Sequence, residues 1–64
     1  MIKMKELEKM TRRELAEVII NDQIKRGIIK EENKEMQINA RLKGCGMVKA
    51  MSWMDLYETA KHFI

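Results

Sequence analysis

The sequence contains no proline and only three glycines, so almost nothing in it interrupts a helix. Proline and glycine mark most tight turns and strand ends, and a chain nearly free of them forms hairpins with difficulty. The glycines stand at Gly27, Gly44 and Gly46 and divide the chain into long uninterrupted stretches. The sequence therefore favours helices, with breaks near Gly27 and near the Gly44–Gly46 pair.

Two short motifs mark helix starts. Thr11 is followed three residues later by Glu14, the pattern of a capping box, in which each side chain satisfies a free backbone N–H of the first turn. Ser52 and Asp55 repeat this spacing with a shorter acid. In both cases a methionine precedes the cap and a leucine follows it, as in a hydrophobic staple. These motifs predict helices that begin directly after Thr11 and Ser52.

Helix ends are indicated by the basic residues that precede Gly27 and Gly44, because cations suit the negative end of a helix dipole. We expect three helices, over about 12–26, 32–43 and 53–63. Residues 2–9 are expected to form a short helical lead-in. In the last of the three helices the apolar residues form one stripe at helical spacing: Trp53, Leu56, Tyr57, Ala60 and Ile64. Ile28 and Ile29 are expected to fill the core from the first connection.

The fold class that follows is all-α. Three short amphipathic helices bury their apolar faces in one shared core, and the expected architecture is a compact three-helix bundle. The chain has 64 residues, which is the size of one small domain, and we expect a single helical domain over 1–64.

The charges outside residues 36–54 balance, with ten Lys and Arg against ten Asp and Glu. Within 36–54 there is no acidic residue, and three basic residues supply the whole net charge of +3. This segment leads into the start of the last helix, where free N–H groups and the dipole favour anions. The candidate site for an anion or for nucleic-acid phosphates comprises Arg41, Lys43, Gly44, Gly46, Lys49 and Ser52. Ordinary capping of a helix C-terminus explains the same basic residues equally simply.

The methionine content is high, at seven in 64 residues. Met47, Met51 and Met54 recur at i, i+4 and i+7, and they form one stripe if the chain is helical from residue 47. Methionine surfaces adapt to partners, and a domain of this size cannot bury every apolar group. The alternative is that these methionines fill the core around Trp53.

Arg12 and Arg13 stand in the first turn of a predicted helix, where cations are unfavourable by some tenths of a kcal/mol. Arg13 recovers part of this by pairing with Glu17 at i, i+4. The remaining mismatch suggests that both arginines face an acidic partner or a phosphate.

The sequence offers little for catalysis. Cys45 and His62 are the only cysteine and the only histidine, so the four N or S ligands of a structural zinc site are lacking and no disulfide can form within the chain. A nucleophilic pair of these two residues has no evident third group to orient it. We therefore expect no enzymatic activity, no catalytic or metal-binding residues and no cofactor.

We expect a small, non-enzymatic regulatory or inhibitory protein of the cytoplasm that binds a larger protein or a second copy of itself. The expected contact residues are Met47, Met51, Met54, Trp53, Arg12 and Arg13. Size and style are typical of small regulators of phages and mobile elements. No apolar run approaches the ~20 residues of a membrane span, so a membrane is not expected as a partner. A chain of 64 residues rarely builds the cleft that a small-molecule substrate needs, so no such substrate is expected. The alternative function is a small nucleic-acid-binding module that uses the basic 41–52 loop.

Overall fold

In the computed structural model, the described residues are 4–44, 46–47 and 49–63, and among them there are helices and no strand. The elements in chain order are α1 (Met4–Leu7), α2 (Arg12–Lys25), the 3-10 helix η1 (Glu31–Asn33), α3 (Lys34–Lys43), α4 (Trp53–Ala60) and the 3-10 helix η2 (Lys61–Phe63). The three main helices match the expected ranges closely, and the all-α fold class is confirmed. The lead-in helix is the single turn of α1, and residues 2 and 3 of its expected range lie outside the described residues.

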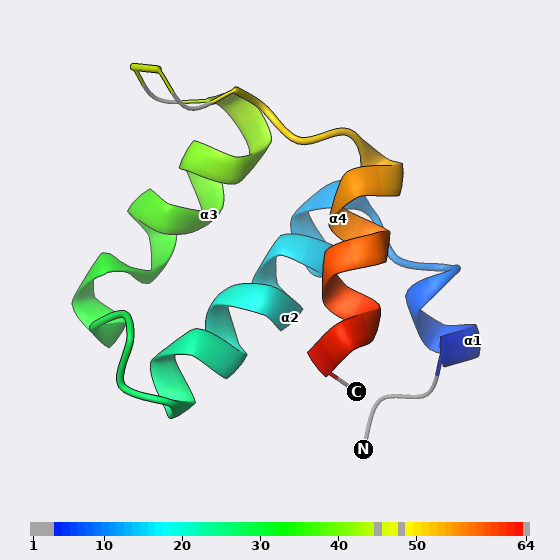
Figure 1. The fold of residues 1–64 in the computed structure, drawn as a ribbon, viewed down its shortest axis with the longest axis horizontal. Helices are drawn as coiled ribbons and strands as arrows, with labels where there is room; N and C mark the ends of the chain where they lie inside the picture. The colour runs from blue at the N-terminus through cyan, green and yellow to red at the C-terminus, as the bar shows by residue number, and fades with distance from the viewer. Residues whose placement is uncertain (1–3, 45, 48, 64) are drawn as a thin grey trace.

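Helix α2 is the centre of the bundle, and both α3 and α4 pack against it (Figure 1). The chain reverses between α2 and α3, so that these two helices run in opposite directions (Figure 1). No helix among the described residues combines the length and the apolar character that crossing a membrane requires.

The fully buried residues among those described are all apolar, and half of them come from α2. These residues are Leu7, Leu15, Ala16, Ile19, Ile20, Ile38, Leu56 and Ala60. Four of them belong to α2, whereas α3 contributes one, Ile38. Because apolar burial stabilises by about 25 cal/mol per Å², α2 is the main source of stability in this small domain.

Both predicted capping boxes are present. At the start of α2, Thr11 Oγ1 accepts the N–H of Glu14 at 3.3 Å, and Glu14 Oε1 accepts the N–H of Thr11 at 3.2 Å. At the start of α4, Ser52 Oγ accepts the N–H of Asp55 at 3.2 Å, and Asp55 Oδ2 accepts the N–H of Ser52 at 3.4 Å. Capping motifs are local, which is why the sequence shows them directly.

The connection after α2 corrects one expectation. Gly27 adopts a positive φ of 78°, and the N–H groups of Ile28 and Ile29 both donate to the carbonyl of Gln23, at 2.9 and 3.4 Å. This tight turn sends the two isoleucine side chains in different directions. Ile29 packs against the core as expected, but the prediction for Ile28 is wrong, because its side chain is 68% exposed.

Candidate functional site

Arg12 begins α2, and its side chain reaches the C-terminal end of α3. Its Nη2 donates to the carbonyl oxygen of Leu42 at 2.8 Å and also to that of Met51. Carbonyls in the last turn of a helix have no partner within the helix, and they carry the negative end of its dipole. A cation that is unfavourable at the start of its own helix is thus placed at the favourable end of another helix.

Arg13 also has partners within the chain. Its Nη2 lies 2.8 Å from both carboxylate oxygens of Glu35, and its Nε lies 3.5 Å from Glu17 Oε1, which confirms the i, i+4 pair. The hydrogen bond to Glu35 and the charge of that carboxylate raise the pKa of the Arg13 guanidinium above its ordinary value. The pair is open to solvent, so water and salt weaken it. These contacts explain both arginines of the first turn without an external partner.

Arg41 is half-buried, and its charge is turned into the molecule. Nη1 donates to Sδ of Met51 at 3.3 Å, and Nη2 donates to Oε1 of Gln23 at 3.5 Å. Its buried Nε has no hydrogen-bond partner among the described residues, and burial lowers the pKa of the guanidinium. The backbone of the following loop is also tied to this residue, because the N–H of Met51 donates to the carbonyl of Arg41 at 2.8 Å. Arg41 is therefore poorly placed for a phosphate in solution.

The remaining residues of the candidate anion site lie at the end of α3, in the loop that follows it and at the start of α4. Lys43 and Lys49 are exposed, while Gly44 and Gly46 have positive φ values of 82° and 59°. The hydroxyl of Ser52 is already engaged in the cap of α4. The carboxylate of its capping partner occupies the helix N-terminus, where a phosphate oxygen would bind.

The four apolar residues expected to contact a partner divide into two pairs. Met51 and Trp53 pack against the core, and Trp53 Nε1 donates to the carbonyl of Met10 at 2.8 Å. Trp53 also stacks on Tyr57, with ring centroids 5.1 Å apart. Met47 and Met54 face solvent, with exposed fractions of 100% and 56%.

The expected methionine stripe is not a feature of one helix. It requires helical structure from residue 47, but α4 begins at Trp53, and the described residues between α3 and α4 are not helical. The cap at Ser52 explains the late start, because it fixes the first residue of the helix at the next position.

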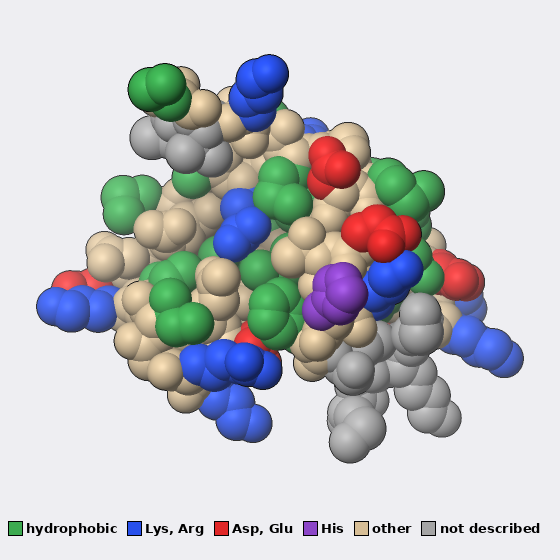
Figure 2. Space-filling model, viewed as in Figure 1, with side chains coloured by type: hydrophobic (Ala, Val, Ile, Leu, Met, Phe, Trp, Pro, Cys, Tyr) green, Lys and Arg blue, Asp and Glu red, His purple; other side chains and the backbone are tan. Residues whose placement is uncertain are grey.

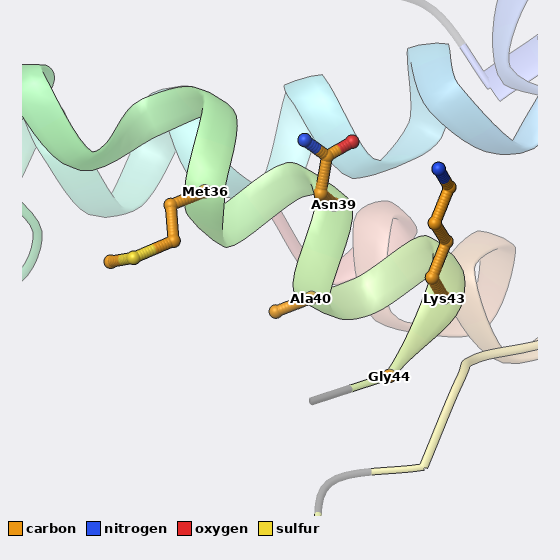
Figure 3. Close-up of a pocket in the computed structure, with 5 residues that line it drawn as sticks. All are labelled: Met36, Asn39, Ala40, Lys43 and Gly44. Carbon is orange, nitrogen blue, oxygen red and sulfur yellow. The ribbon is translucent and has the colours of Figure 1, made fainter. Parts of the chain in front are cut away.

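The surface of α3 carries a hollow that the sequence reasoning missed. It measures about 260 Å³ and is lined by Met36, Asn39, Ala40, Lys43 and Gly44. In Figure 3 the side chains of Met36 and Ala40 point the same way, one turn apart, and Asn39 and Lys43 extend from a neighbouring side of the helix. Gly44 lacks a side chain and leaves the end of the hollow open.

Apolar side chains reach solvent along this part of the molecule. Met36 is 59% exposed, and hydrophobic groups appear at the outer edge of α3 and at the tip of the loop that follows it (Figure 2). The signal in the sequence was present, since Met36 and Ala40 are spaced at i, i+4 inside the acid-free segment. This signal was hidden because the apolar residues of α3 lie all around the helix axis. Without a single apolar stripe, the sequence does not show which face of the helix is buried.

The possible catalytic pair stays untested. His62 is exposed in η2, and Cys45 lies outside the described residues. Among the described residues, no three side chains of His, Cys, Asp or Glu gather as a set of metal ligands.

Comparison with known proteins gives no further guide to function. No family model, no curated protein and no solved structure matches this chain.

Proposed function

We propose that this chain is a small, non-enzymatic regulator or inhibitor that acts in the cytoplasm by binding a larger protein. The observation that carries the proposal is the set of large apolar side chains open to solvent: Ile28, Met36, Met47 and Met54. These side chains lie on different segments of a chain of 64 residues, and a partner that covers several of them would remove their apolar groups from water. Its size and style are those of regulators carried by phages and mobile elements.

Two of these side chains, Met36 and Met47, belong to the acid-free segment of the chain. The same segment contains Lys43 and Lys49, whose side chains are exposed. Apolar contacts supply affinity, and the lysines steer an acidic partner toward the surface. Arg12 and Arg13 bond groups of the same chain at its surface, so we assign them to the fold of the free protein and leave the steering to the lysines.

The geometry favours protein binding over the nucleic-acid alternative. A phosphate site at the start of α4 would need Arg41 and Ser52, and both are engaged by other groups of the chain. The carboxylate of Asp55 lies at the same helix end and would repel a phosphate. Lys43 and Lys49 alone form a weak electrostatic footprint for a polyanion.

The test uses two pairs of substitutions on the same protein. The immobilised chain is used to capture a partner from the cells that carry it, beside Met47→Asp with Met54→Asp and Lys43→Glu with Lys49→Glu. The proposal predicts capture at moderate salt that is lost with the aspartates, because they place charge in an apolar contact.

A parallel titration addresses nucleic acid. Trp53 fluorescence and anisotropy are followed while duplex or single-stranded DNA is added at low and at moderate salt. Binding that falls steeply with salt and disappears with the lysine substitutions would establish the nucleic-acid alternative instead. A melting temperature that rises with protein concentration would show self-association.

A further inference from the structure

Helix α3 presents two opposite faces. Its one fully buried residue is Ile38, which packs in the core. Residues of an α-helix are about 100° apart around the axis, so Met36 and Ala40, two positions before and after Ile38, each point about 160° away from it. The hollow lined by Met36 and Ala40 therefore lies on the outer face of α3, and Figure 3 shows both side chains on that side.

The hollow is a shallow depression along one helix. At about 260 Å³ it falls below the ~300–1,000 Å³ of most small-molecule sites, and it is open to solvent. Met36 supplies an adaptable wall, and Ala40 and Gly44 supply a floor with little side chain. Apolar side chains of a partner can pack on such a floor, and polar groups at its edge are typical of the rim of a protein contact.

The charge at the rim selects an acidic occupant. Lys43 lines the hollow, and the sequence from Met36 to Met54 contains no acid that could neutralise it. The nearest carboxylate on α3 is that of Glu35, which is already bound to Arg13. A carboxylate of a partner is thus the natural counter-ion of Lys43.

The same charge argues against a second copy of the chain as the occupant. In a two-fold dimer through this face each copy would present Lys43 and no acid from residues 36–54, in a chain of net charge +3. Like charges so arranged disfavour association.

We propose that the outer face of α3 docks an acidic peptide segment of a partner protein, with one bulky apolar side chain in the hollow beside Met36 and Ala40 and a carboxylate paired with Lys43. This inference rests on the proposed function and gives it a site and a partner chemistry. It also moves the contact away from Trp53 and Met51, which pack in the core.

The experiment selects peptides of about three helical turns from a random library displayed on phage, with the intact protein as bait. Selected peptides are synthesised and titrated against wild type and three variants. Ala40→Arg fills the hollow while keeping a good helix former, and Lys43→Glu reverses the charge at the rim. Asn21→Arg is the matched control, because it adds the same side chain at an exposed position of α2 that does not line the hollow.

We expect the selected peptides to combine aspartate or glutamate with leucine, isoleucine, phenylalanine or tryptophan. Their affinity should fall by about tenfold or more with Ala40→Arg and with Lys43→Glu, and stay unchanged with Asn21→Arg. Backbone amide shifts in nuclear magnetic resonance spectra should map to α3. Circular dichroism confirms that each variant is folded.

Three results would overturn the docking site: no enrichment, peptides without acids, or equal affinity for the Ala40→Arg variant. Peptides whose amide shifts map to α4 would also refute it, but they would leave protein binding in place. The proposed function itself is wrong if the capture experiment also fails and the Trp53 titration shows salt-sensitive DNA binding.

Discussion

Helices α2 and α3 have similar charged sequences but are held in the domain in different ways. Helix α2 fully buries four residues, Leu15, Ala16, Ile19 and Ile20. Helix α3 fully buries only Ile38, Leu42 packs against the core beside it, and polar contacts complete its attachment. A helix can thus be held along its inner side by two apolar residues and a few arginines, while its outer side stays open to solvent.

Three arginines supply the polar contacts between α2 and α3. Arg12 bonds the last turn of α3, Arg13 pairs with Glu35 in its first turn, and Arg41 extends from α3 to Gln23 of α2. Polar contacts of this kind contribute modestly to stability but set position strictly. We therefore expect substitutions in α2 to lower the stability of the whole domain, and substitutions at the contacts of α3 to have smaller effects.

The largest effect on stability is expected at the buried apolar face of α2. Ile19→Ala removes a fully buried side chain and leaves a cavity, which should lower the free energy of unfolding by about 2–5 kcal/mol. Urea denaturation followed by circular dichroism measures it. Ile28→Ala, at a largely exposed isoleucine, serves as the control and should change stability by less than about 0.5 kcal/mol. Equal losses for the two variants would contradict the described core.

The next effect is expected at the bond from α2 to the end of α3. Arg12→Ala leaves the carbonyls of Leu42 and Met51 without their donor and should lower the free energy of unfolding by about 1–2 kcal/mol. Amide hydrogen exchange should accelerate most in the last turn of α3. Arg12→Lys keeps the charge but lacks the planar guanidinium, so its free energy of unfolding should lie between those of wild type and Arg12→Ala. An alanine variant as stable as wild type would refute the capping role of Arg12.

The two capping boxes allow a matched test on α2 and α4. Thr11→Ala and Ser52→Ala each remove one side-chain acceptor from a first turn, at a cost of about 1 kcal/mol. Thermal unfolding measures both, and Thr11→Ser should keep most of the stability that Thr11→Ala loses. A silent Ser52→Ala variant would show that α4 begins without help from its cap.

The smallest effect is expected at the exposed pair of Arg13 and Glu35. Glu35→Gln removes the charge but keeps the shape, and the melting temperature should drop slightly at low salt and hardly at all at high salt. Glu31→Gln, at an exposed glutamate of η1, is the matched control. A loss that persists at high salt would mean that the pair supports α3 more firmly than its exposure implies.

The sequence predicted what depends on neighbouring residues. Both capping boxes, the helix that ends before Gly27 and the helix that ends before Gly44 follow from patterns a few residues long. The all-α fold follows from the same patterns, because three amphipathic helices in a short chain have few ways to bury their apolar faces.

What the sequence could not predict depends on contacts between distant residues. Arg12 bonds carbonyls 30 and 39 positions away, and Trp53 bonds one 43 positions away. No local pattern distinguishes an arginine that caps another helix from one that awaits a partner. For the same reason the sequence alone did not separate Met51, which packs inside, from Met47 and Met36, which face solvent.

One face of α3 is fixed in the core by Ile38, and the opposite face, which carries Met36, is open to solvent. The most direct measurement compares the free energies of unfolding of Ile38→Ala and Met36→Ala, two substitutions on the same helix that remove side chains from opposite faces. We predict a loss of about 2–5 kcal/mol for Ile38→Ala and less than about 0.5 kcal/mol for Met36→Ala. Comparable losses for the two variants would show that the outer face of α3 is part of the core and would contradict the account.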